Sequence, residues 1–335
     1  MSASLAAPRA SLLLLAYNQE RDAEAAALSC LAQVCEPLEI VFSDDASSDR
    51  THEILRAVAA DYRGPHRVVV RRNDANLGIT GHYNRLVEES SGELLITAAA
   101  DDTSRPDRAA RLLAAWDATG GRADLIASHL VDVDAAGVEH GVLKVDDLAA
   151  CGGVDGWLRR RPFIIGAGHA FTRRMMRTFG PLDPAIHHED QVMVFRALAA
   201  GGAVTVDAPL VRYRRGGASA TPAARSVAET RAWRIRRLRA EIAEREQIMR
   251  DAVVAGCADA VAAAFEPLRV RQAYLSRLYA ADSARGRLRA LFMAGGPAPA
   301  WRFRKWLQAS SAVLRIRAGR RSTEDGGPDR QAPIT

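Results

Sequence analysis

Short apolar segments alternate with longer amphipathic ones over the first 130 residues of the chain. The short segments are rich in Leu, Ile and Val, which is typical of strands buried on both faces of a sheet. They cover residues 11–16, 38–43, 67–71 and 93–98. Between them, residues 22–32 and 51–61 repeat apolar side chains at helical spacing. This alternation predicts an α/β fold with a mostly parallel sheet flanked by helices.

The pattern changes twice further along the chain. Residues 152–213 are less regular, with a helix predicted after Asp190 and a short strand at 203–206. Beyond residue 219 the sequence becomes helical and rich in arginine, and it ends in a polar stretch without core-forming residues. We therefore expect an α/β domain over residues 8–218, a basic helical extension over 219–318 and a disordered tail over 319–335.

The charge of the chain divides at the same place. Residues 1–230 contain 25 Lys and Arg against 30 Asp and Glu, whereas residues 231–335 contain 21 against 10. A protein that coats nucleic acid would be basic throughout, so the formal net charge of +6 does not indicate a nucleic-acid partner. The two parts need separate interpretations.

Cysteine spacing and hydropathy bear on the compartment. The four cysteines form no CxxC pair and have no histidine at zinc-finger spacing, which favours reduced thiols. The apolar run near the N-terminus is too short for a signal-peptide core, and no stretch of about 18 apolar residues could span a bilayer. We expect a cytoplasmic protein whose membrane contact, if any, is peripheral and at the inner face.

Polar side chains follow three of the predicted strands. They are Tyr17-Asn18, the segment 44–49, and Asp101-Asp102. In an open α/β sheet, ligands bind beyond the carboxyl ends of the strands. Two carboxylate pairs at one edge would repel each other unless a cation lay between them. With no His or Cys in the cluster, the oxygen ligands favour Mg²⁺ or Mn²⁺, ions that commonly bind substrate phosphates as well.

Other interpretations of these residues remain open, and some functions are excluded. Ser48 and Asp49 could form a turn and cap the following helix, and Asp101-Asp102 could be a solvated loop. The sequence has no P-loop and no GxGxxG after the first strand, which disfavours dinucleotide chemistry. A response-regulator receiver domain is excluded, because it needs a lysine near its last strand and residues 1–143 contain no lysine.

These residues resemble a known family, the family 2 glycosyltransferases with the GT-A nucleotide-diphospho-sugar fold. The first part of the resemblance lies in residues 13–20 (LLLAYNQE), 39–51 (EIVFSDDASSDRT), 76–78, 83–85, 91–93, 101–102 and 105–108. The second part is similar to the acceptor-side loop of that family, at residues 166–183, and to its ED motif, at 188–190.

The resemblance implies a role for individual residues. It implies that the nucleotide sugar contacts Tyr17, Asn18, Glu20, Asp45, Asn76, Gly78, Asn84, Arg85 and Asp101. Within that set, Tyr17 and Asp45 are expected at the nucleobase. Asp101 and Asp102 are expected at the ribose, the diphosphate and a Mg²⁺ or Mn²⁺ ion. The acceptor or diphosphate side is expected to include His188, Glu189 and Arg214, with Asp190 as the general base.

The sequence departs from the family pattern at two positions. Ala99 stands where the first Asp of a D-x-D motif is usual, so the metal site depends on the adjacent pair that follows. Tyr213-Arg214-Arg215 is followed by Gly216, where relatives often have Tyr-Arg-x-His. If that His contacts metal or diphosphate in relatives, one of these arginines must replace it or the contact is absent.

The activity that the resemblance implies is inverting transfer of a sugar. The donor would be a nucleotide-diphospho-sugar, UDP- or dTDP-linked, and the acceptor a hydroxyl of a cell-surface glycan or a lipid-linked intermediate. A nucleotidyltransferase is disfavoured because residues 16–19 form no Gly-rich basic loop. The alternative is a catalytically silent GT-A module with a binding or assembly role.

Several further residues have two interpretations. His187 and His188 could contact metal or only position the ED segment, and Arg173-Arg174 could bind phosphate or begin a solvated helix. Trp157 could stack on a sugar, although a core position is favoured. The basic-aromatic helices after residue 230 could contact an anionic membrane leaflet, form a homo-oligomer or cap the domain.

Overall fold

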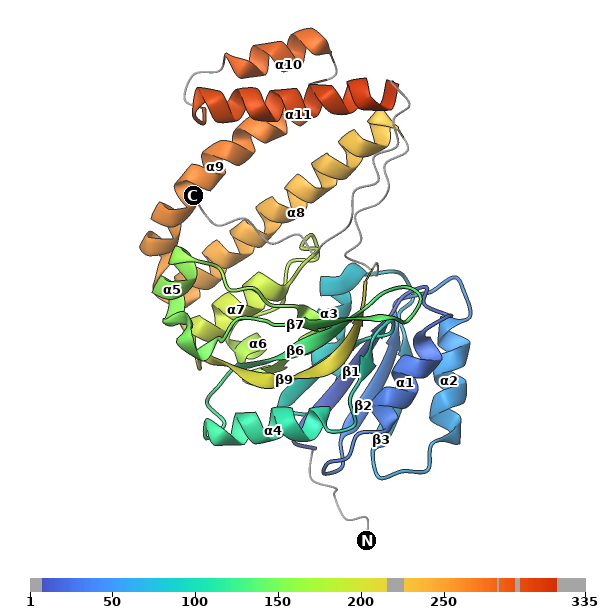
Figure 1. Ribbon diagram of the computed structural model, residues 1–335. Coiled ribbons are helices and arrows are strands. Elements are labelled where there is room, and N and C mark those ends of the chain that lie inside the picture. The colour runs from blue at the N-terminus through green and yellow to red at the C-terminus, as the bar shows by residue number, and fades with distance from the viewer. Residues whose placement is uncertain (1–7, 216–225, 282, 293–295, 318–335) are drawn as a thin grey trace. The chain divides into compact units, whose positions relative to one another are not determined.

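The chain is described by a computed structural model that covers residues 8–215, 226–281, 283–292 and 296–317. The described residues form two compact units, one up to residue 215 and one from residue 226 (Figure 1). The predicted boundary at residues 218 and 219 and the predicted tail over 319–335 lie outside the described residues.

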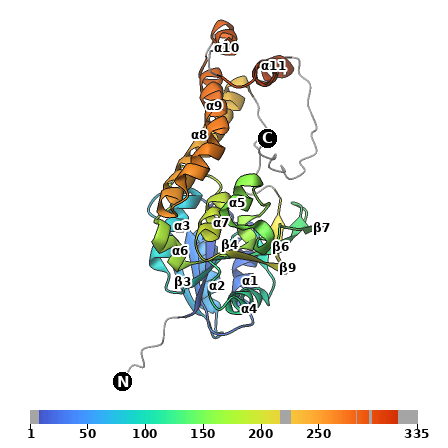
Figure 2. The same ribbon diagram turned by 90° about the vertical axis from the view of Figure 1, so that its left-hand side faces the viewer.

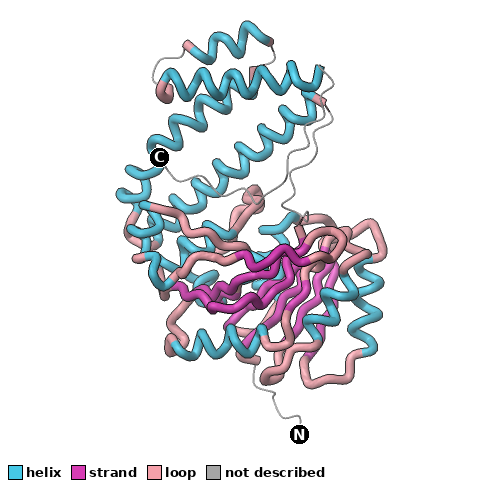
Figure 3. Tube along the Cα trace, in the orientation of Figure 1, coloured by secondary structure: helices cyan, strands magenta, loops and turns pink. Residues whose placement is uncertain are grey.

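The first unit is built on a nine-stranded sheet whose N-terminal half is parallel, as the sequence predicted. Its strands pair in the order β3-β2-β1-β4 (Figure 3). Their bounds are β1 Ala10–Ala16, β2 Glu39–Asp44, β3 Arg67–Arg72 and β4 Leu94–Ala99. The first, second and fourth are almost entirely buried, which explains their continuous apolar sequences.

The other half of the sheet is mixed. Its strands are β5 Thr103–Ser104, β6 Leu125–Val133, β7 Glu139–Leu143, β8 Ala170–Thr172 and β9 Ala203–Arg214. β8 pairs antiparallel with both β4 and β6, while β9 lies between β6 and β5. β9 is longer than the predicted strand at 203–206 because it continues alongside β6 and ends at Arg214. That extension delivers an arginine to the edge where β4 ends.

Helices cover both faces of this sheet, which gives three layers (Figures 1 and 2). One face packs against α1 Ala23–Leu31, α2 Thr51–Asp61 and α4 Arg108–Ala118. The opposite face carries α3 Gly78–Glu89, α6 Arg173–Phe179 and α7 Asp190–Ala199. Shorter helices are η1 Ala149–Cys151, α5 Gly153–Arg159 and η2 Gly166–Gly168.

The strand register brings the expected site residues to one edge. Ala16 at the end of β1 is opposite Asp44, and Leu15 is opposite Ala99. The amide of Asp45 donates to Ala16 O at 2.9 Å, and the amide of Ala100 donates to Leu15 O at 3.0 Å. The segments that follow β2 and β4 therefore leave the sheet on either side of the end of β1.

The second unit consists of helices. They are α8 Val227–Val254, α9 Ala258–Ala280, α10 Ala284–Leu291 and α11 Pro299–Arg317. α8 and α9 pack side by side, and α10 and α11 contact each other and α9. A small core forms around Tyr274, Leu278 and Ala290. Among the described residues, no helix combines the length and the apolar character that crossing a membrane requires.

Candidate active site

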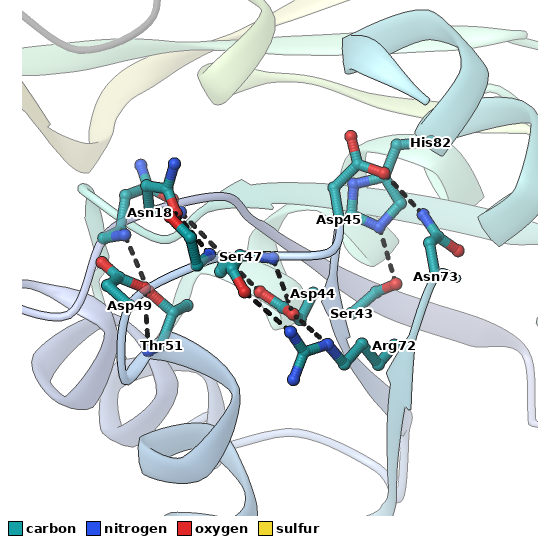
Figure 4. A network of polar contacts seen from close by, with 12 residues as sticks. Asn18, Ser43, Asp44, Asp45, Ser47, Asp49, Thr51, Arg72, Asn73 and His82 are labelled. Carbon is teal, nitrogen blue, oxygen red and sulfur yellow. Dashed lines mark hydrogen bonds and ion pairs between the residues drawn. The ribbon is translucent and has the colours of Figure 1, made fainter. Parts of the chain in front are cut away.

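The turn after β2 is held by its first aspartate, Asp44 (Figure 4). This carboxylate is fully buried and accepts hydrogen bonds from the amide of Ser47, at 3.1 Å, and from the Ser47 hydroxyl. Arg72 Nε lies 3.3 Å from Asp44 Oδ2. Asp44 is therefore committed to the structure of the turn.

The second aspartate, Asp45, orders the loop that leads into α3 (Figure 4). It accepts hydrogen bonds from Asn73 Nδ2 at 2.7 Å and from the amides of Leu77 at 2.9 Å and Gly78 at 3.0 Å. Asn76 Oδ1 accepts from the same Gly78 amide at 3.1 Å, and Gly78 has a φ of +70° that favours glycine. Asp45, Asn76 and Gly78, which the resemblance assigns to the nucleotide, thus form one rigid turn.

The segment after β1 is locked to the segment after β2. The Asn18 amide donates to Ser47 Oγ at 2.8 Å, and Asn18 Oδ1 accepts from the Ser48 amide at 2.8 Å. Asp49 accepts from the amides of Thr51 at 3.0 Å and Glu20 at 3.1 Å, so it holds the turn before α2, as the turn interpretation predicted. The N-cap of α2 is Arg50, which has no side-chain cap, so the capping interpretation is wrong for Ser48 and Asp49. Tyr17 at the end of β1 is half-exposed beside these contacts.

The acidic pair after β4 has carboxyl groups with raised pKa values. Asp102 is buried, and its Oδ1 accepts from the Arg214 amide at 2.8 Å, while its buried Oδ2 has no hydrogen-bond partner among the described residues. Burial, followed by the neighbouring charge of Asp101, raises the pKa of Asp102 to about 8. Burial likewise raises the pKa of Asp101, and Asp22 adds to that effect. The solvated-loop interpretation is therefore wrong for Asp102.

Arg214 supplies positive charge at this acidic pair. Its Nη2 lies 3.0 Å from Asp22 Oδ1, and its charge lowers the pKa of both Asp101 and Asp102 against the effect of burial. Arg215 instead forms an ion pair with Asp132. Of the two arginines that could replace the missing histidine of the family pattern, Arg214 is the one at the carboxylates. Gly216 lies outside the described residues.

A fully buried guanidinium, that of Arg108, lies beneath the same site. It donates to Thr97 O at 2.6 Å, Ala167 O at 2.8 Å and Ser104 Oγ at 2.9 Å. Burial lowers the pKa of Arg108 to about 10, and the charge of Asp102 is among the effects that oppose this shift. Arg108 therefore joins the strand that carries the acidic pair to the short helix η2.

Replacing Arg108 with Met should destabilise the protein by about 3–5 kcal/mol, because one buried and two part-buried acceptors lose their donor and the carboxylate pair loses a cation. Urea unfolding followed by circular dichroism measures this change. The matched control is Arg105→Met, three residues earlier, where the guanidinium is exposed and pairs with Asp107. An equal loss in both variants would contradict the role given to Arg108.

The ED segment at the start of α7 packs on η2. Glu189 is buried, and burial raises its pKa, while a hydrogen bond from the Tyr83 hydroxyl opposes that shift. A Cβ at Gly166 would meet Asp190 Oδ1 and would lie 2.7 Å from Glu189 Oε1. Thr97 Oγ1 lies 3.0 Å from Gly166 O, which ties this glycine to β4. The Glu189 and Asp190 carboxylates thus lie against a backbone that β4 and Arg108 hold in place.

Replacing Gly166 with Ala should reduce turnover about 10²-fold while the protein stays folded, because the added methyl group displaces the Asp190 carboxylate. The assay is donor turnover at saturating substrate, with the thermal midpoint as the check on folding. Retained turnover would show that the position of this carboxylate does not matter for the reaction.

Other residues from the sequence interpretation have structural partners. Asn84 Nδ2 donates to Leu182 O at 2.7 Å, and its Oδ1 accepts from the Leu182 amide at 2.8 Å, so Asn84 holds the loop before the ED segment. Arg85 Nε lies 2.6 Å from Glu89, on the same helix. His188 is exposed. A direct contact of these side chains with a donor or acceptor stays a prediction.

Two of the open interpretations are decided by burial. Trp157 is fully buried and its Nε1 donates to Gln191 Oε1 at 3.0 Å, so it is a core residue. Arg173 is buried and donates to Gly92 O and Ser90 Oγ, both at 2.9 Å, while Arg174 lies 2.7 Å from Asp124. These arginines join α6 to neighbouring elements, and Arg173 is not the solvated residue that the sequence suggested.

The donor set at the end of β4 fits a divalent cation. Asp101 and Asp102 supply hard carboxylate oxygens, and Asp102 Oδ2, which has no partner in the described part of the chain, is the atom that a cation would satisfy. Within the described ranges, no group of three or more His, Cys, Asp and Glu is arranged to hold a metal. A cation at this pair would therefore take its remaining ligands from water and substrate, as Mg²⁺ and Mn²⁺ commonly do.

The order of these motifs along the chain matches one protein family. The sequence model of Glycosyl transferase family 2 matches residues 11–134, from β1 to the end of β6. These residues form a family 2 glycosyltransferase domain. The glycosyltransferase domain is similar to the succinoglycan biosynthesis protein ExoO of Rhizobium meliloti, with 32% identity over 113 residues. That match spans 34% of the present chain and 31% of ExoO, so the chain covers about a third of this relative.

Solved structures extend the likeness beyond the matched sequence. TarS 1–349 of S. aureus in complex with UDP-GlcNAc is 15% identical, with a TM-score of 0.54 over 95% of this chain and 94% of TarS 1–349. The mannosyltransferase PcManGT of Pyrobaculum calidifontis, in complex with GDP-Man and Mn²⁺, is 18% identical, with a TM-score of 0.55 over 92% of this chain and 81% of PcManGT. The glycosyltransferase domain therefore has the GT-A fold that the sequence resemblance implied.

Site residues that the sequence did not single out are Gln19, Asp22, Tyr83, Arg108 and Gly166. Tyr83 and Arg108 lie inside the motifs at 83–85 and 105–108. The sequence gives their residue types but does not show that they are buried. Asp22 directly precedes α1, and an aspartate in that position is usual at the start of a helix, so its type did not indicate a site residue. No sequence signal connects Gly166 with Asp190, because 23 residues separate them in the chain and only the packing of the fold brings them together.

Proposed function

We propose that this protein transfers a sugar from a nucleotide-diphospho-sugar, UDP- or dTDP-linked, to a hydroxyl of a cell-surface glycan or lipid-linked acceptor, with inversion at the anomeric carbon. The observation that supports it best is the acidic pair of half-buried Asp101 and buried Asp102, whose pKa values are raised, in the same unit as Asp190, whose carboxylate lies against Gly166. Relatives that bind UDP-GlcNAc or GDP-Man, and one named for succinoglycan biosynthesis, support the donor class and the glycan product.

The residues divide the reaction between them. Asp45 and the turn after β2 would bind the nucleobase, with Tyr17 half-exposed at its side. Asp101 and Asp102 would hold Mg²⁺ or Mn²⁺, which when bound stabilises the negative charge of the departing diphosphate. Arg214 would add fixed positive charge beside the same oxygens.

Asp190 would remove the proton of the acceptor hydroxyl as the new bond forms. Glu189, whose neutral form burial favours, would position Asp190 at the start of α7. A single displacement needs no nucleophilic Ser or Cys on the protein, and it inverts the anomeric centre. His188, exposed before this segment, would lie on the acceptor side.

The function is tested by incubating the protein with UDP-, dTDP- and GDP-linked sugars and Mn²⁺, and by measuring nucleotide diphosphate release with and without acceptor glycans. We expect release with one donor, stimulated by one acceptor and abolished by chelation. The product's anomeric configuration, read by NMR, tests inversion. No release with any donor, together with no thermal stabilisation by donor and Mn²⁺, would support the alternative, a silent binding or assembly module.

We also propose that the protein works in the cytoplasm and contacts the inner face of the membrane. This location would bring the domain to lipid-linked acceptors. Fractionation of cells that produce the protein tests it, with the expected result that a salt-sensitive part of the protein sediments with membranes.

A further inference from the structure

α10 carries an exposed stripe of arginine and large apolar side chains. Arg285, Leu288, Arg289 and Phe292 are spaced three, four and seven residues from the first, so they lie on one face of the helix and just past its end. All four are exposed, Leu288 by 47% and Phe292 by 81%. Exposed aromatic and aliphatic side chains of this size, next to each other, mark a contact surface.

α11 repeats the pattern. Ala300, Phe303, Arg304 and Leu307 have the same spacing and are all exposed, Phe303 by 53% and Leu307 by 44%. The two helices thus present two short stripes of matching composition, which we call the outer stripes of α10 and α11.

The other faces of these helices are already packed. Ala290 of α10 is buried against Tyr274 and Leu278, and Trp301 and Trp306 of α11 pack on the same cluster. The Tyr274 and Trp301 ring centroids are 5.8 Å apart in an edge-on arrangement. The outer stripes therefore do not contribute to this core, and their apolar side chains have to be explained by another contact.

The charged residues of the segment that carries the stripes all have the same sign. Between Asp282 and Glu324 the sequence contains ten Arg and Lys residues and no Asp or Glu. Six of the ten lie within α10 and the first half of α11, at positions 285, 287, 289, 302, 304 and 305. A partner surface must therefore be strongly anionic.

We propose that the outer stripes of α10 and α11 dock on the surface of an anionic lipid bilayer. Arginines beside exposed Phe and Leu fit this ligand, because the guanidinium groups reach headgroup phosphates while the apolar side chains enter the acyl boundary. A second copy meeting through the same stripes would bring like charges together. A nucleic acid would satisfy the arginines but offers no hydrocarbon for Leu288, Phe292 and Leu307.

The proposal rests on the membrane contact assigned under the proposed function and names the surface that makes it. It can fail separately from the transfer activity, because vesicle binding and donor turnover are measured in different assays.

The test is co-sedimentation of the full chain with vesicles of phosphatidylcholine alone or mixed with phosphatidylglycerol. We expect binding to the mixed vesicles only, weakened by salt. Reversing three stripe charges together (Arg285→Glu, Arg289→Glu, Arg304→Glu) should reduce the partition coefficient by about 100-fold or more. Exchanging the apolar residues (Leu288→Ser, Phe292→Ser, Phe303→Ser) should reduce it by about tenfold or more.

The matched control is Arg269→Glu on α9, an exposed arginine outside the stripes that pairs with Glu266. This control variant should bind vesicles as the unmodified protein does. All variants should keep the thermal midpoint and the donor turnover of the unmodified protein. Equal binding to both vesicle types, or unchanged binding by both stripe variants, would overturn the proposal. So would a dimer, or a complex with duplex DNA, that the serine variant abolishes while vesicle binding persists.

Discussion

Replacing Asp190 with Asn should lower the rate of sugar transfer by about 10²–10⁴-fold, the usual contribution of a general base. The amide has nearly the same shape as the carboxylate, so it fits against Gly166 but cannot accept the acceptor's proton. Donor binding should remain, because the nucleotide-side residues lie on the turns after β1 and β2. Single-turnover kinetics with donor and acceptor measure the rate, and thermal stabilisation by donor and Mn²⁺ measures binding.

The neighbouring acid provides the matched control. Glu189 is buried and its pKa is raised, so Glu189→Gln resembles the form that burial already favours. We expect this variant to lose less than tenfold in rate, with the fold and donor binding intact. If Asp190→Asn transfers sugar as fast as the unmodified protein, the base is another group. A larger loss of transfer rate in Glu189→Gln than in Asp190→Asn would make Glu189 the general base and Asp190 the positioning residue.

Replacing Asp102 with Asn should stabilise the metal-free protein and abolish its response to Mn²⁺. The pKa of Asp102 rises from an ordinary value of 3.8 to about 8 in the folded protein. Between these two pH values the folded state holds a proton that the unfolded chain has released, so the free energy of unfolding falls as pH rises. Asn removes this dependence. The thermal midpoint of the variant should exceed that of the unmodified protein by about 2–4 °C or more at pH 8, and by less at pH 5.

The response to Mn²⁺ follows from the same proton. A divalent cation must displace it, so stabilisation of the unmodified protein should grow from pH 6 to pH 8 and reach about 2.7 kcal/mol at a hundredfold the dissociation constant. Asp107→Asn is the control, because Asp107 pairs with Arg105 and Arg111 and lies outside the acidic pair. Equal stabilisation of Asp102→Asn by Mn²⁺ would show that this carboxylate does not bind the cation.

The parallel half of the sheet could be predicted because its signal is local. Buried parallel strands are continuous apolar runs, and β1, β2 and β4 have sequences of that kind. The placement of Asp45 and Asp101 at one edge followed from strand direction alone. By contrast, β8 is three residues long and β9 runs eight residues past its predicted end, since their pairing partners determine them. Such partners are not legible in a short stretch of sequence.

The partners of the acidic pair were not predictable in the same way. Arg214 reaches Asp102 only because the antiparallel β5–β9 pair sets Thr103 opposite Arg212. Arg108 lies in the motif at residues 105–108, but its sequence context does not show that it is fully buried. Gly166 begins the segment that resembles the acceptor-side loop, and only the structure shows that it leaves space for two carboxylates.

The sequence by itself determined the kind of chemistry this protein can perform. Residue type and position after a strand place carboxylates at the ligand-binding edge, and these are local properties. Only the tertiary structure decided which carboxylate oxygens remain available: Asp44 is hydrogen-bonded within its own turn, while no described residue hydrogen-bonds to the buried Oδ2 of Asp102. It also decided their proton affinity, because the pKa of a carboxyl depends on burial and on charges such as Arg108 and Arg214, which folding brings from distant parts of the chain.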